Sequence, residues 1–179
     1  MLKITIPAIE MFDDQTQTFI STEEQTLELQ HSLVSVSKWE SKWCKPFLRK
    51  EPKTFEETVD YIKCMTVTEN VDPNVYSSLT QSNVNEINAY IEAPMTATTF
   101  YGEKQKSSKD IITTELIYYW MISLNIPMEC QNWHLNRLLT LIRVCNEKNA
   151  PAKKMSRREA ASRYASLNAA RRNKLNTRG

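Results

Sequence analysis

Glycine is nearly absent from this sequence. Only Gly102 and the terminal Gly179 occur among its 179 residues. Loops that cradle phosphates and turns that bind dinucleotides need several glycines, because a Cβ atom blocks positive φ angles and close approach of the backbone to a ligand. The composition therefore argues strongly against a P-loop or Rossmann protein. The glycine-flanked nucleophile elbow of hydrolases and the paired-histidine helix of metalloproteases are missing as well.

Clustered cysteines are lacking too. The four cysteines are scattered along the chain, at Cys44, Cys64, Cys130 and Cys145. No CxxC motif or close pair occurs, which predicts free thiols in a reducing compartment and no disulfide framework. A zinc site that combines cysteines with His31 or His134 is a minor alternative, because the ligand spacing of known zinc sites is missing. We expect no metal and no cofactor.

The sequence has no long uninterrupted apolar run. Its most apolar stretch, residues 110–149, is broken by Glu115, Glu129 and Arg137 and by a proline near its middle. The first residues also lack the basic segment and apolar run of a secretory signal peptide. We therefore expect a cytosolic protein that does not associate with a membrane.

Charge is distributed unevenly along the chain. Residues 151–179 contain nine basic residues and one acidic residue, a net charge of +8, whereas the remainder contains 14 basic and 20 acidic residues, a net charge of −6. The candidate contact residues in this basic tail are Arg157, Arg158, Arg163, Arg171, Arg172 and Lys174. Such a segment is a solvated helix, a nucleic-acid contact, or a docking arm for an acidic protein surface such as another copy. Only one aromatic residue, Tyr164, is available there to stack on bases.

Residues 110–149 form the stretch around which the fold is expected to be organised. Apolar residues recur at helical steps on both sides of Asn125–Pro127, which predicts two amphipathic helices joined as an αα-hairpin. The proline should end the first helix near Asn125. The predicted inward residues are Ile112, Leu116, Tyr119, Trp120 and Leu124 in the first helix and Leu135, Leu138, Leu139, Ile142 and Cys145 in the second.

The remaining patterns predict a mainly α, α+β fold. Alternating apolar and polar residues in 1–30 predict a small β-hairpin or three-strand meander, with a turn at Asp13–Gln15. Helices should follow in 31–150, capped by Ser32, by Thr54 with Glu57 in a capping box, and by Thr80 or Ser82. We expect a globular body over 1–150 and a basic helical or flexible tail over 151–179.

Three side chains are the strongest candidates for a site in the body. Trp39 and Trp43 lie four residues apart on one helix face; they are more often core residues, but they also suit a groove for a partner. His134 is a candidate general base, although no nucleophile or acid can be placed beside it from the sequence, so a structural role is favoured. We therefore predict no catalytic residues, and Trp39 and Trp43 as partner-binding residues.

Several short segments rich in apolar and aromatic residues resemble those of a known family. They lie in the segments Ser32–Leu48, Ile112–Asn149 and Lys153–Gly179, and include SKWES, YYWM and WHLNRLLTLI. Together these segments resemble the tail assembly chaperones of long-tailed bacteriophages, over most of the chain from residue 27 onward. The strings contain no catalytic motif.

The resemblance implies a non-enzymatic assembly factor. Such a protein acts in the host cytoplasm, where it coats the long helical tape-measure protein while the tail tube polymerises around it. The short N-terminal strands can also pair with those of another copy, which makes a homo-oligomer an additional expectation. The alternative is a structural virion protein at a tail or head interface, whose basic tail contacts nucleic acid.

Overall fold

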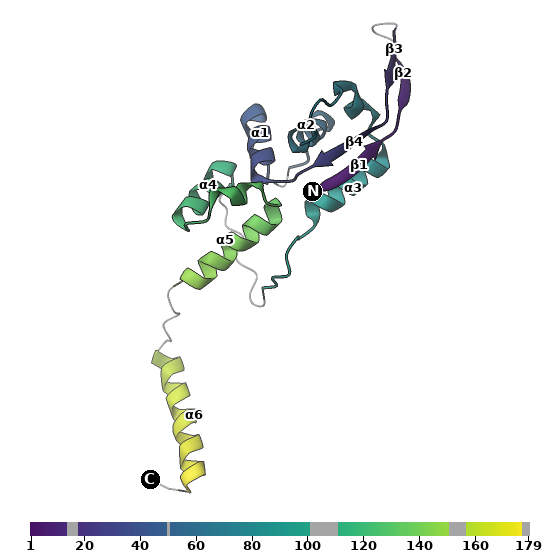
Figure 1. Cartoon of the computed structure of the whole chain (residues 1–179). Helices are drawn as coiled ribbons and strands as arrows, with labels where there is room; N and C mark the ends of the chain where they lie inside the picture. The colour runs from purple at the N-terminus through teal and green to yellow at the C-terminus, as the bar shows by residue number, and fades with distance from the viewer. Residues whose placement is uncertain (14–17, 50, 101–110, 151–156, 177–179) are drawn as a thin grey trace. The chain divides into compact units, whose positions relative to one another are not determined.

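A computed structural model describes the chain over residues 1–13, 18–49, 51–100, 111–150 and 157–176. The chain divides into two compact units, Met1–Asn146 and Glu147–Gly179. The first unit begins with a β-ribbon and continues with helices, and the second is dominated by one helix (Figure 1). The predicted mainly α fold with an N-terminal β element is therefore confirmed.

Four short strands build the N-terminal ribbon, with bounds β1 Leu2–Ile6, β2 Ile9–Asp13, β3 Thr18–Thr22 and β4 Gln25–Leu29. Strand β1 pairs antiparallel with β4, and β2 pairs antiparallel with β3. Ile4 lies opposite Leu27, and both are buried, whereas the Thr5 opposite Thr26 is exposed. The period-two alternation thus correctly predicted which face of β1 and β4 packs on the helices. Strand β2 was not predicted, and most of the expected turn lies outside the described residues.

The first three α-helices begin with the expected capping signals, and their bounds are α1 Leu33–Trp43, α2 Phe55–Met65 and α3 Gln81–Glu92. Ser32 caps α1, and Thr54 forms the predicted capping box with Glu57 at the start of α2. Of the two candidates for α3, Thr80 is the cap. A short 3-10 helix, η1, covers Pro73–Ser78 between α2 and α3.

The second half of the chain contains α4 Thr114–Ser123, η2 Met128–Asn132, α5 Leu135–Asn149 and α6 Arg157–Leu175. Asn125 adopts a left-handed conformation with φ 52° just after α4, and Pro127 follows, so the predicted end of this helix is confirmed. The buried residues of α5 are the predicted Leu135, Leu138 and Ile142.

The predicted inward face of α4 is partly wrong. Its buried residues are Thr114, Ile117 and Met121, whereas Tyr119, which we expected to face inward, is 63% exposed. The reason is that α4 is apolar on almost every side, so the spacing of its apolar residues does not determine which side is buried. The structure therefore leaves large apolar side chains of α4 on the surface.

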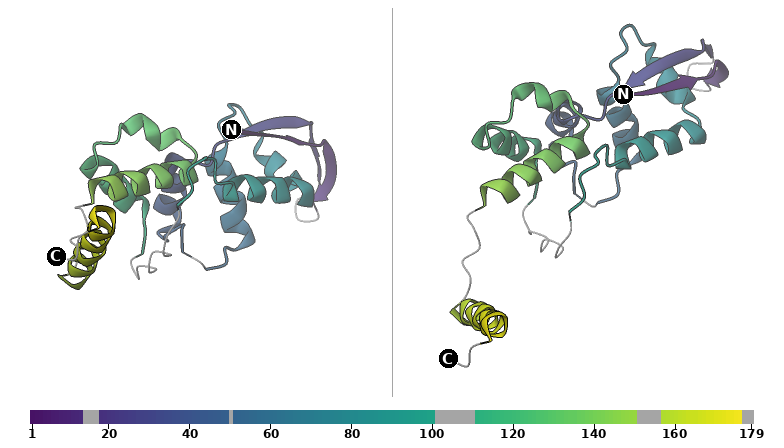
Figure 2. Two further views of the ribbon diagram at one scale, coloured as in Figure 1. Left: turned by 90° about the horizontal axis from the view of Figure 1, so that it is seen from below. Right: turned by 60° about the horizontal axis from the view of Figure 1, so that its bottom comes forward.

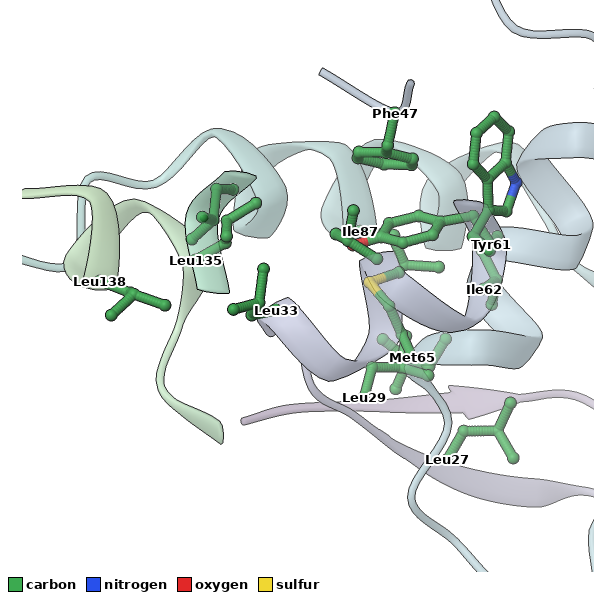
Figure 3. Close-up of a cluster of buried hydrophobic side chains, with 14 of the residues drawn as sticks. Leu27, Leu29, Leu33, Phe47, Tyr61, Ile62, Met65, Ile87, Leu135 and Leu138 are labelled. Carbon is green, nitrogen blue, oxygen red and sulfur yellow. The ribbon is translucent and has the colours of Figure 1, made fainter. Parts of the chain in front are cut away.

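Within the first unit, a single core joins β1, β4 and the helices α1 to α5, and α1 lies at its centre. Helix α1 packs against α2, α4 and η2, while α3 packs against β1. Figure 2 shows α4 and α5 on one side of α1 and the ribbon with α3 on the other. Leu29 and Met65 meet under α1, and the ring of Phe47 lies above that of Tyr61 at a tilt of 38° (Figure 3). Of the two predicted apolar stripes, that of α5 thus contributes Leu135, Leu138 and Ile142 to this shared core, whereas that of α4 contributes only the partly buried Ile112, Trp120 and Leu124.

Candidate functional site

His134, the candidate general base, is held on both ring nitrogens. Its Nε2 donates to the carbonyl oxygen of Tyr90 at 3.0 Å, and its Nδ1 accepts from the backbone N–H of Asn136 at 3.3 Å. Because a carbonyl can only accept and an N–H can only donate, these contacts assign the neutral tautomer with the proton on Nε2. Burial lowers the pKa of His134. Its contacts support the structural role favoured from the sequence.

A second histidine lies against the first. The rings of His31 and His134 meet edge to face, with centroids 4.9 Å apart. His31 Nδ1 is hydrogen-bonded to the hydroxyl of Tyr61, whose pKa is raised far above its usual range by burial. Burial, with a smaller contribution from His134, lowers the pKa of His31 to about 3. The pair is therefore neutral at physiological pH and joins the end of β4, α2 and the start of α5.

The cysteines form no metal site in the part of the chain that the structure describes. Cys44, Cys64, Cys130 and Cys145 are all free thiols. Over residues 1–13, 18–49, 51–100, 111–150 and 157–176, no three His, Cys, Asp or Glu side chains are grouped so that they could hold a metal ion. Among these same residues, no helix combines the length and apolar character needed to cross a bilayer.

The tryptophans of α1 face α2. Trp39 is only 2% exposed, and its Nε1 donates to the carbonyl oxygen of Glu57 at 2.8 Å. Trp43 stacks on Trp39 with ring centroids 6.1 Å apart, and its Nε1 donates to Asp60 Oδ2 at 2.9 Å. Trp39 is thus a core residue, as the more frequent role of such residues suggested, and offers no exposed side chain to a partner. Trp43 is half-buried.

Replacing Trp43 by phenylalanine is expected to lower the free energy of unfolding by about 1–2 kcal/mol, because a hydrogen bond to a carboxylate is lost while most of the ring packing remains. Urea denaturation measures the effect. In an Asp60→Ala background the same replacement should cost much less, because the acceptor is already gone. Equal costs in both backgrounds would show that the indole–carboxylate hydrogen bond does not stabilise the protein.

A third residue of α1 fixes the start of α4. The buried carboxyl group of Glu40 accepts hydrogen bonds from Phe47 N at 2.7 Å, Thr114 N at 2.8 Å and Thr114 Oγ1 at 2.6 Å. Glu40 therefore supplies an acceptor for the first turn of α4, whose N-cap residue Thr113 makes no side-chain cap. The start of α4 is thus attached to α1.

The outer side of α4 forms an exposed apolar surface. Glu115, Tyr119 and Ile122 follow at steps of four and three residues and so lie on one face. Tyr119 and Ile122 are 63% and 66% exposed, and Ile111, just before the helix, is exposed too. We call these four residues the α4 surface. Exposed apolar side chains in one helical row are typical of a protein-binding site.

The candidate residues of the basic tail lie on α6, in the second unit. All its described side chains from 161 to 176 are exposed, as are Arg157 and Arg158. The predicted contact residues Arg157, Arg158, Arg163, Arg171, Arg172 and Lys174 therefore stand on one helix. Three large apolar residues, Tyr164, Leu167 and Leu175, are exposed among them. Helix α6 therefore exposes an apolar row beside the predicted basic residues.

Comparison with known proteins identified no relative. No protein-family model, curated protein or solved structure matches this chain. The α4 surface and α6 are therefore interpreted from their own chemistry.

Proposed function

We propose that this protein is a non-enzymatic assembly factor that binds an elongated helical protein through the α4 surface. The observation that carries the proposal is the exposure of Tyr119 and Ile122 on one face of a short helix that Glu40 attaches to the core. Together with the resemblance to tail assembly chaperones, it supports our proposal that the partner is the tape-measure protein of a bacteriophage tail, bound in the host cytoplasm during tail assembly.

The physical basis is burial of apolar area by a preorganised helix. A helical partner that exposes its own apolar stripe before assembly can cover Tyr119 and Ile122 by ordinary helix–helix packing. Because Glu40 and the buried Ile117 and Met121 already fix α4, little conformational entropy is lost when the partner binds. A modest apolar contact also leaves the partner releasable, which an assembly factor requires.

Co-expression with the tape-measure protein tests this function. We expect the two proteins to copurify and the tape-measure protein to become more soluble. Ile122→Glu should abolish copurification, because it places a charge within the apolar contact. Val67→Glu is the matched control, since Val67 is also exposed and apolar but does not belong to the α4 surface. Copurification that survives Ile122→Glu would exclude the α4 surface as the binding site.

A second candidate function is favoured by the charge of α6. Its exposed arginines and lysine can neutralise phosphates, as the alternative of a virion protein that contacts nucleic acid requires. That function predicts salt-sensitive DNA binding, lost when residues 151–179 are removed, and the presence of the protein in purified particles. An assembly chaperone should be absent from particles analysed by mass spectrometry.

A further inference from the structure

The exposed residues of α6 include an apolar row with one arginine in it. Tyr164, Leu167, Arg171 and Leu175 follow each other at steps of three, four and four residues. At these steps the four side chains lie on one side of a helix, over about 16 Å of its length. The three apolar members of the row are exposed in the structure.

Helix α4 contains the first three positions of this row in reverse order. Glu115, Tyr119 and Ile122 follow at steps of four and three residues, with an acid where α6 has a base. If the two rows are aligned antiparallel, Ile122 meets Tyr164, Tyr119 meets Leu167, and Glu115 meets Arg171. Ile111 is exposed just before the helix and is not part of its row.

We propose that α6 of one copy binds the α4 surface of a second copy as an antiparallel helix pair, with Arg171 contacting Glu115. The contact buries the two apolar rows against each other and pairs unlike charges beside them. The chain's net charges favour it as well, because residues 151–179 carry +8 and the remainder −6. The apolar side chains of α6 have no corresponding partner on a phosphate backbone, which favours a protein as occupant.

Self-association of the full chain, followed by analytical ultracentrifugation over a concentration series, tests the proposal. Ile122→Glu or Leu167→Glu should each raise the dissociation constant by about 30-fold or more, the effect of losing an apolar anchor of the contact. Val67→Glu should leave the constant unchanged. A wild-type chain that stays monomeric at its highest soluble concentration would overturn the proposal.

Mixing the two variants shows whether these two surfaces bind each other between copies. The Ile122→Glu chain keeps an intact α6, and the Leu167→Glu chain keeps an intact α4 surface, so the mixture should form a complex that neither variant forms alone. If circular dichroism shows that both variants are folded, absence of a mixed complex would exclude binding between copies. The proposal would then be wrong even if α6 binds α4 of its own chain.

Charge exchange tests the register of the helix pair. Glu115→Arg and Arg171→Glu should each weaken self-association, and the two changes combined in one chain should restore it. Arg172→Glu is the matched control, because Arg172 lies about 100° further round α6. Failure of the combined variant to recover would contradict the antiparallel register.

The inference concerns the same α4 surface as the proposed function but does not depend on the tape-measure protein. Self-association without copurification of the tape-measure protein would reject the proposed function alone. Copurification from a strictly monomeric chain would reject the helix pair alone. If both occur, α6 and the tape-measure protein compete for α4, and added tape-measure protein should dissociate the self-assembled chain.

Discussion

Replacing Glu40 by alanine is expected to lower the free energy of unfolding by about 3–5 kcal/mol, since each buried donor left without an acceptor costs about 1–3 kcal/mol. The change removes the acceptor of Phe47 N, Thr114 N and Thr114 Oγ1 at once. These donors come from two segments far apart in the sequence, so their loss should loosen α4 from α1. An effect of this size is a large share of the stability of an ordinary domain.

Urea denaturation of Glu40→Ala beside two reference variants measures this effect. Glu40→Gln keeps an acceptor oxygen of the same reach and should cost less than the alanine variant. Glu56→Ala, on the exposed side of α2, should stay within about 0.5 kcal/mol of the wild type. A cost for Glu40→Ala as small as that of Glu56→Ala would show that the three hydrogen bonds do not hold α4.

Acidification below pH 6.5 is expected to destabilise the protein through His31. The folded protein keeps this histidine neutral, with a pKa of about 3, whereas the unfolded chain binds a proton near its ordinary pKa of about 6.5. The contribution of the neutral imidazole is therefore fully present above pH 6.5 and is lost as the pH falls toward 3. The loss is about 1.4 kcal/mol per pH unit from His31 alone. The lowered pKa of His134 acts in the same direction.

The free energy of unfolding should be measured between pH 6.5 and 4.5, where the histidines dominate its pH dependence. The carboxyl groups with lowered pKa values, such as Asp60, titrate below this range. His31→Gln should reduce the pH dependence in this window to the part contributed by His134, since glutamine does not titrate. The C–H resonances of His31 in the folded wild type should show no protonation at pH 5. A normal titration near pH 6.5 would contradict the proposed burial of a neutral ring.

Local signals were sufficient to predict most of the elements of the fold. Ser32 and Thr54 cap helices because their side chains satisfy the backbone N–H groups three residues on, a relation visible in any short window of sequence. A helix cannot continue through Pro127, because proline has no backbone N–H to donate, and this effect is also local. The alternation in β1 and β4 likewise predicts its own buried face.

The features that depend on distant residues could not be predicted. Whether Tyr119 faces inward depends on α1, which lies some eighty positions earlier in the sequence. Because α4 is apolar on almost every side, its own sequence does not indicate which side is buried. The three donors around Glu40 and the contact of His31 with His134 bring together segments whose proximity only the tertiary structure shows. The sequence also could not show that Trp39, a predicted partner-binding residue, is buried and that its indole donates to the carbonyl oxygen of Glu57.

The division of the chain at Asn146 has a consequence for how long an assembly would grow. In the proposed helix pair, the first unit provides the α4 surface and the second provides α6. A head-to-tail row of copies therefore always has one free α4 surface and one free α6 at its ends. Nothing in the subunit itself would then limit the number of copies. The length of the row would therefore be limited from outside, because a partner that covers the α4 surface prevents the α6 of the next copy from binding.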